Sequence, residues 1–211
     1  MATDVSGGIE CRHPAWDPDQ LSNQPWVKEL DLHPLYVDHD YASLGLLFGV
    51  ENSAGFQPVA EGRGLPDDVS SELRDELQPW LDKGEMFGAT WISWAELAAI
   101  DPKMRAENYV GRLSWRQAFG ALLTRQMVQA EWPAEAIEVV GAPPEGFDPL
   151  VPFPEWTVGD TQCAYEPLTA EAVLFGSVFG EVSHWRHVFA VMKALAGRYG
   201  ADGVRLVVAF D

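Results

Sequence analysis

The stretch that decides the fold is Val204-Arg205-Leu206-Val207-Val208-Ala209-Phe210. β-Branched and aromatic residues favour strands, and a mostly apolar run of this length is typical of a central strand. Near the other end of the chain, Ile9-Glu10-Cys11-Arg12 alternates in polarity, and we interpret Gly8 to Leu32 as a long-looped hairpin. Together these segments predict a mixed β-sheet that includes both chain termini.

Helix signals fill much of the remaining chain. Asp40 and Ser70 can each cap a helix, and Ser93-Trp94-Ala95-Glu96 and Ser114-Trp115-Arg116-Gln117 have the spacing of a capping box. A last helix is expected after Ser183, and a short strand over 137–140. We therefore predict a single α+β domain over 1–211, with helices packed on one face of the sheet and a proline-rich connector at 142–156.

Charge excludes several partners. The 211 residues carry 32 Asp and Glu against 14 Lys and Arg, a formal net charge of -18. Such a chain repels a nucleic-acid backbone and an anionic membrane, so we expect neither partner. The first residues lack the pattern of a secretory signal, and two cysteines are too few for a disulfide framework. We expect a soluble protein in the cytoplasm.

The charge is unevenly distributed along the chain. Residues 103–125 hold five basic residues and one acidic residue, whereas residues 126–185 hold ten acidic residues and no Lys or Arg. Arg112 and Arg116 flank the start of the helix expected at Ser114, where they would form an anion-binding site. The alternative, which we favour, is that this basic segment packs beside the acidic half and is neutralised there.

Two clusters offer metal-binding side chains. Asp38, His39 and Asp40 supply imidazole and carboxylate ligands, and Glu181, His184 and His187 are spaced by three. The favoured alternatives are a solvated turn in which Asp40 caps the next helix, and a partly exposed first helical turn. We predict no cofactor and assign no catalytic residue.

Nine tryptophans are many for this length. Most should belong to the core. Trp16, Trp132 and Trp156 lie in non-periodic stretches near prolines, and we interpret them as exposed anchors for a partner, because tryptophan is enriched at interface hot spots.

Three stretches resemble an uncharacterised protein family of bacteria and their phages. They are Asp38-His39-Asp40-Tyr41-Ala42-Ser43-Leu44 running into Gly49-Val50-Glu51-Asn52, Arg63-Gly64-Leu65-Pro66-Asp67-Asp68-Val69-Ser70, and Trp91-Ile92-Ser93-Trp94-Ala95-Glu96-Leu97. The ends at Asp4-Val5-Ser6 and 204–211 also look like those of the family, which has no known activity. Its members often carry histidines where this chain has Ser6, Phe87 and Ala89.

These observations favour a non-catalytic, acidic binding protein that engages a basic protein partner, in the manner of an inhibitor, an immunity protein or a protein of phage conflict. The alternative is a metal-dependent enzyme or a small-anion-binding protein that uses one of the Asp and His clusters or the two arginines. The sequence leaves the oligomeric state open.

Overall fold

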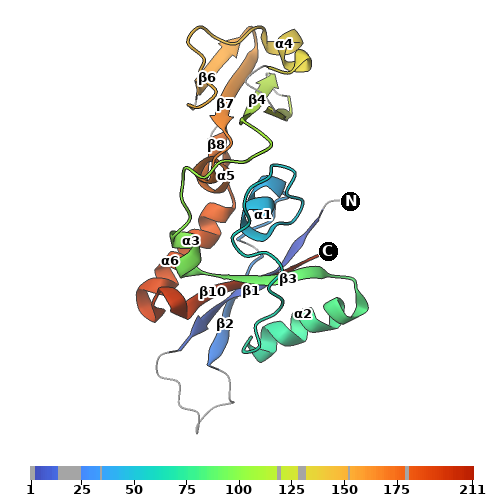
Figure 1. The fold of residues 1–211 in the computed structure, drawn as a ribbon, viewed down its shortest axis with the longest axis vertical. Helices are drawn as coiled ribbons and strands as arrows, with labels where there is room; N and C mark the ends of the chain where they lie inside the picture. Colours follow the sequence, from blue (N-terminus) through green and yellow to red (C-terminus); the bar gives the residue numbers. More distant parts are fainter. Residues whose placement is uncertain are drawn as a thin grey trace. The chain divides into compact units, whose positions relative to one another are not determined.

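The computed structural model describes residues 3–13, 25–33, 35–117, 120–127, 132–151, 153–178 and 181–211. They form two compact units, the first from residues 1–51, 58–100 and 184–211, the second from residues 52–57 and 101–183. Each unit contains helices and its own four-stranded sheet (Figure 1). The α+β class is confirmed, while a single domain over 1–211 stays a prediction.

Both ends of the chain lie in the sheet of the first unit. Its strands, in spatial order, are β2 (Trp26–Asp31), β1 (Val5–Arg12), β10 (Val204–Phe210) and β3 (Phe87–Ser93). β1 pairs with β10 from Val5↔Phe210 to Cys11↔Val204. The hairpin and the central position of β10 are as expected, but the mixed sheet was wrong, because every neighbouring pair runs antiparallel. An apolar run predicts a buried strand without setting the direction of its neighbours.

Helices cover both faces of this sheet, so the expectation of helices on one face was also wrong. α2 (Ser71–Lys83) packs on one face, where Leu73 and Leu77 join Val207 and Ala209 in a buried cluster. On the other face Phe210 contacts Phe48 of α1 (Tyr41–Phe48), whose ring lies 5.9 Å from that of Trp185 in α6 (Trp185–Tyr199). The two groups of helices lie on opposite sides of the strands in Figure 1. All seven residues of β10 are buried because both faces are covered.

The expected caps begin three helices of this unit. Asp40 accepts from the amides of Ala42 and Ser43 at the start of α1, and Ser70 accepts from Leu73 N in α2. The capping box at Ser93 and Glu96 opens α3 (Trp94–Ala98). Short-range side-chain bonds of this kind satisfy amides that have no partner inside the helix. A short 3-10 turn, η1 (Ala201–Gly203), leads from α6 into β10.

The second unit contains β5 (Leu122–Met127), β4 (Gly111–Gln117), β7 (Thr161–Pro167) and β6 (Phe153–Val158), in that spatial order. The helix expected at Ser114 was wrong, because this segment is strand β4. Leu113 and Trp115 are buried in the core cluster, whereas Arg112 pairs across the sheet with Glu166 of β7. Alternation between the two faces overrode the local capping signal.

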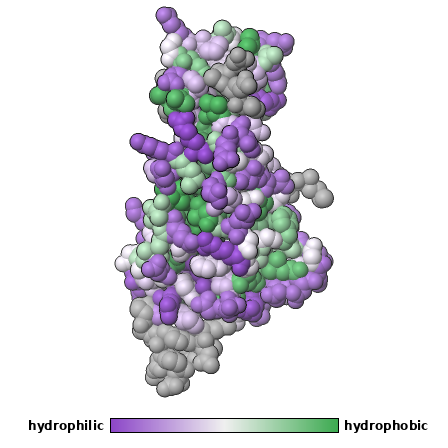
Figure 2. Space-filling model, viewed as in Figure 1, coloured by the Kyte–Doolittle hydropathy of each residue, from purple (hydrophilic) through white to green (hydrophobic). Residues whose placement is uncertain are grey.

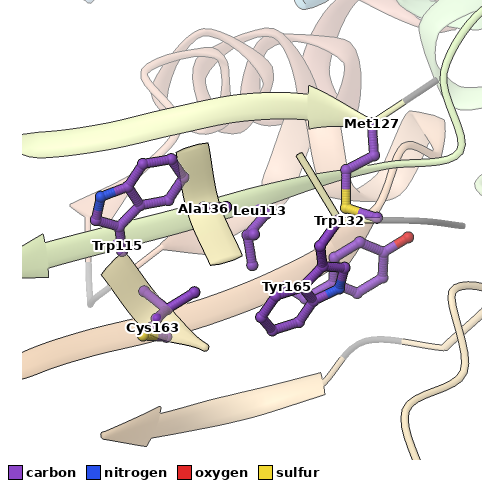
Figure 3. Packing of buried hydrophobic residues seen from close by; sticks show 8 residues of the cluster. Leu113, Trp115, Met127, Trp132, Ala136, Cys163 and Tyr165 are labelled. Carbon is purple, nitrogen blue, oxygen red and sulfur yellow. The ribbon is translucent and has the colours of Figure 1, made fainter. Parts of the chain in front are cut away.

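Residues of the sheet and of α4 (Ala134–Val140) form the core of this unit, and Figure 3 shows how their side chains pack together. Trp115, Cys163 and Tyr165 from β4 and β7 meet Trp132 and Ala136 there. The strand expected over 137–140 was wrong: Ala136 and Val140, four residues apart, are both buried and form the inner side of the helix.

The chain between α4 and β6 carries most of the proline-rich connector and forms turns. The unit is completed by α5 (Ala170–Phe175), β8 (Ser177–Val178) and β9 (Glu181–Val182). Within the described residues, we find no helix with the length and apolar character needed to cross a membrane.

Candidate functional site

A hollow in the first unit lies beside the start of α2. It measures about 880 Å³, and we call it the tryptophan hollow. Its lining residues are Trp26, Arg63, Leu65, Pro66, Asp67, Asp68, Trp91, Ser93, Ala95, Glu96, Ala99, Asp202 and Arg205. They come from β2, β3, β10, α3, η1 and the loop before α2, so elements distant in sequence build one site.

Arg205 lines the hollow and is buried, and strand register explains its position. It is the one charged residue of β10, and the sheet places it between Glu10 of β1 and Ser93 of β3. Its Nε donates to Glu10 Oε2 at 2.7 Å, and Nη1 donates to Asp68 Oδ1 at 2.7 Å. Glu10 is fully buried, and its other oxygen accepts from Ser70 N at 2.7 Å. Two carboxylates therefore neutralise one buried guanidinium.

Two arginines lie over two tryptophan rings. The guanidinium carbon of Arg205 is 3.8 Å from the ring centre of Trp26 and 5.8 Å from that of Trp91. Arg63 lies 5.0 Å from the ring centre of Trp91, and its Nη2 contacts Glu96 Oε1 at 2.7 Å. These are cation–π distances, so the protein's own cations already occupy aromatic faces in the hollow.

Backbone contacts hold Arg63 in place. Gly64 N donates to Ala89 O of β3 at 2.8 Å, which keeps the loop along the outer edge of that strand. Arg63 Nη1 donates to Trp91 O at 3.2 Å and Nη2 to Val59 O at 2.9 Å. With Glu96 accepting from both nitrogens, the terminal nitrogens of Arg63 are bonded on several sides.

Two carboxylates of the hollow have a lowered pKa. Burial alone would raise the pKa of Asp68, but its hydrogen bond to Arg205, the charge of Arg205 and the bond from Trp26 together lower it. Burial likewise acts to raise the pKa of Glu96, and the hydrogen bonds from Arg63 and Ser93 outweigh it. Both groups are therefore charged at neutral pH and committed to partners.

Asp67 and Asp202 differ from these two carboxylates. Both line the hollow and are exposed. Among the described residues, neither carboxylate has a hydrogen bond or an ion pair. The hollow thus combines an aromatic and aliphatic lining with two carboxylates that remain available.

The site predicted at Arg112 and Arg116 is not at a helix start, since both residues lie on β4. Arg112 Nη2 contacts Glu166 Oε2 at 3.1 Å, and Arg125 Nη2 contacts Glu135 Oε1 at 2.8 Å. Residues of the acidic half thus partly neutralise the basic stretch, as in the alternative that we favoured. The arginines that form these ion pairs lie on strands and not on the expected helix. The helix that was to supply the anion site is absent there.

The predicted cluster Asp38, His39 and Asp40 forms the solvated turn that we favoured. Asp40 caps α1, His39 Nε2 lies 2.8 Å from Asp4 Oδ1, and Asp38 accepts from the amide of His39. Over the described part of the chain, no three His, Cys, Asp or Glu side chains gather as a metal would require.

His184 and His187 lie at the start of α6. The helix begins at Trp185, one residue later than a Ser183 cap would place it. His184 contacts the ring of Tyr36 edge-on with a ring separation of 6.2 Å, and its buried Nδ1 has no partner among the described atoms. His187 is exposed, so the two imidazoles occupy different surroundings.

The three tryptophans that we predicted as exposed anchors differ in their surroundings. Trp16 lies outside the described residues. The prediction that Trp132 is an exposed anchor was wrong, because this side chain is buried in the second unit against Phe147 and Trp156. Trp156 is half-buried beside the same cluster. The aromatic neighbours of Trp132 come from separate segments of the chain, and a local sequence pattern does not reveal such contacts.

The two thiols are buried and unpaired with each other. Burial raises the pKa of Cys11 to about 12, with the charges of Glu29 and Glu10 adding to it, and burial raises the pKa of Cys163 to about 11. Both thiols are therefore protonated at neutral pH and poor nucleophiles.

Comparisons of this chain with protein-family models, curated proteins and solved structures gave no match.

Proposed function

We propose that this chain is a non-catalytic binding protein that engages a basic protein partner, with the tryptophan hollow receiving a cationic side chain of that partner. One observation carries the proposal. The two arginines of the hollow are bonded to carboxylates, whereas Asp67 and Asp202 have, among the described residues, none of the hydrogen bonds or ion pairs that hold Asp68 and Glu96. The charged groups of the hollow that remain available to a ligand are therefore these two carboxylates.

The lining of the hollow suits a lysine or arginine side chain. A long basic side chain can lay its methylene stem on apolar walls while its charged end reaches a carboxylate. Leu65, Pro66 and Ala99 supply such walls, and Asp67 and Asp202 supply the carboxylates. A negatively charged ligand would instead have to displace Glu10 or Glu96 from an arginine, which costs the energy of an existing ion pair.

The net charge of -18 supports the same class of partner, because an acidic protein attracts a basic one and speeds its association. Inhibitors and immunity proteins work in this way, and the resemblance to a bacterial and phage family fits that setting. The proposal places the protein in the cytoplasm, where buried thiols stay reduced. The alternative of a metal-dependent enzyme has no supporting cluster in the described part of the chain.

The test is a titration of the full chain with a short arginine-rich peptide, in which tryptophan fluorescence reports binding. We expect saturable binding that weakens as salt rises. The double variant Asp67→Asn/Asp202→Asn should bind roughly tenfold more weakly, since each of two exposed ion pairs contributes up to about 1 kcal/mol and a total of about 1.4 kcal/mol is tenfold.

A matched control is Glu138→Gln/Asp160→Asn, which removes the same charge from exposed positions of the second unit. This control should bind the peptide like the wild type. Equal weakening in both double variants would show that only net charge matters, and preference for an acidic peptide of the same length would contradict the proposal.

A further inference from the structure

A second hollow lies at the other end of β2 in the same unit. It measures about 510 Å³, and we call it the Trp80 hollow. Its lining residues are Val5, Ser6, Gly7, Asp31, His33, Asp75, Glu76, Leu77, Trp80 and Met86. Trp80 is 44% exposed, which is unusual for so large an apolar side chain.

We propose that the basic partner segment is extended and occupies both hollows at once, with one cationic side chain in the tryptophan hollow and a second in the Trp80 hollow. This inference rests on the proposed function and adds the mode of recognition. Three independent features of the structure carry it: the charges around Lys28, the exposed aromatic surface and the path of β2.

Carboxylates outnumber cations in the Trp80 hollow. Lys28 Nζ contacts Asp31 Oδ1 and Glu76 Oε1, each at 2.5 Å, and lies 4.0 Å from Glu72. Asp75 also lines the hollow and has no ion pair among the described residues. One ammonium group is therefore shared by several carboxylates, and a second cation would meet a favourable potential there.

Apolar surface accompanies this charge. Trp80 and Met86 line the hollow, and Trp80 is exposed. Figure 2 shows apolar residues at the surface where α2 ends and β3 begins, among hydrophilic ones. Lys83 Nζ lies 4.6 Å from the ring centre of Trp80, so this ring already accepts a cation. An exposed tryptophan next to the carboxylate of Asp75, unpaired among the described residues, suits a contact with arginine or lysine.

Strand β2 connects the two hollows. Trp26 at its start lines the tryptophan hollow, and Asp31 at its end lines the Trp80 hollow. Five steps at about 3.3 Å each separate these residues by about 17 Å. Helix α2 follows the same path, since Asp68 just before it lines one hollow and Trp80 lines the other. A partner segment in extended form would span this distance with about five residues.

Charge also selects the occupant. A second copy of this chain would bring its own net charge of -18 to an acidic surface and be repelled. A basic segment is attracted at both hollows. In an extended chain, side chains four or six residues apart project to the same side. We therefore expect two basic residues at one of these separations in the partner.

The experiment compares peptides that contain one arginine with peptides that contain two arginines, four, six or ten residues apart, in a neutral Thr/Val background that favours the extended form. We expect a separation of four or six to bind wild-type protein at least tenfold more tightly than one arginine, because the second contact becomes intramolecular. A separation of ten should lose most of that gain.

Variants of the Trp80 hollow test whether the second arginine of the peptide binds there. Asp75→Asn/Trp80→Ala should bind the two-arginine peptide no better than the one-arginine peptide, because only the tryptophan hollow is left to hold an arginine. The matched control Glu138→Gln/Leu150→Ala removes one exposed carboxylate and one exposed apolar side chain from the second unit and should keep the gain. Equal affinity at all separations, or a full gain in the Asp75→Asn/Trp80→Ala variant, would overturn the two-hollow inference and leave single-site binding intact. Absence of binding to every peptide would overturn the proposed function as well.

Discussion

Glu10 and Arg205 stand 195 residues apart in the sequence, and Glu10 Oε2 accepts a hydrogen bond from Arg205 Nε at 2.7 Å. The pair joins β1 to β10, the two strands that bring the ends of the chain together. Through its second oxygen Glu10 also holds the amide of Ser70, which caps α2. One buried carboxylate therefore links the sheet, the helix and Arg205 of the tryptophan hollow.

Replacement of Glu10 should destabilise the first unit strongly. Glu10→Gln leaves a buried guanidinium with one carboxylate fewer, and breaking a buried ion pair costs roughly 3–5 kcal/mol. We expect a fall of that size in the free energy of unfolding, measured with urea. Glu29→Gln, which removes an exposed carboxylate beside His13, serves as the control and should cost under about 1 kcal/mol. Equal stability of the two variants would contradict this role of Glu10.

Acid should weaken the same region. The pKa values of Asp68 and Glu96 are lower in the folded chain than their ordinary values. Their contribution to stability is thus fully present above the unfolded pKa values of about 4 and is lost as the pH falls through the folded values. We expect the free energy of unfolding to decline below about pH 4. In Asp68→Asn/Glu96→Gln this decline should be smaller, and an identical acid limb in both proteins would refute the assignment.

The capping box offers a local test. Ser93→Ala removes the acceptor for Glu96 N, and loss of a helix cap costs roughly 0.5–2 kcal/mol. Ser93→Thr keeps a hydroxyl at the same place and should retain most of the stability. Thermal unfolding followed by circular dichroism compares the three proteins. A threonine variant as unstable as the alanine variant would show that the hydroxyl contributes nothing.

Trp132 should behave as a core residue. Trp132→Ala removes a buried ring that contacts Phe147 and Trp156, and such truncations cost roughly 3–5 kcal/mol. Trp80→Ala, at an exposed position, should cost much less. Near-ultraviolet circular dichroism during urea unfolding measures both losses. A change within about 0.5 kcal/mol for Trp132→Ala would restore its interpretation as a surface anchor.

Local signals predicted the first unit well. Asp40, Ser70 and Ser93 act on amides two or three residues away, so the sequence alone contains the whole interaction. The apolar run over 204–210 placed its strand at the centre of the sheet. The capping pattern at Ser114 led to a wrong helix prediction, because such a pattern can also occur in a strand. There, the alternation of Leu113 and Trp115 with Arg112 and Arg116 decided the structure.

The candidate site was largely missed because its parts meet only in the folded chain. Trp26, Trp91 and Arg205 lie on three strands far apart in sequence. One signal was present: Arg205 interrupts an apolar run, and Glu10 lies in the strand expected at the other end. Two opposite charges in strands predicted to share a sheet indicate a buried pair.

Nine tryptophans provide the most direct test of the tryptophan hollow as a docking site. The measurement is the nitrogen–hydrogen correlation spectrum of the indole groups during titration with an arginine-rich peptide. The account predicts that the signals of Trp26 and Trp91 shift in a saturable manner while those of Trp132 and Trp156, in the second unit, stay in place. Shifts confined to Trp132 and Trp156, or no shift of Trp26 and Trp91 at saturating peptide, would contradict it.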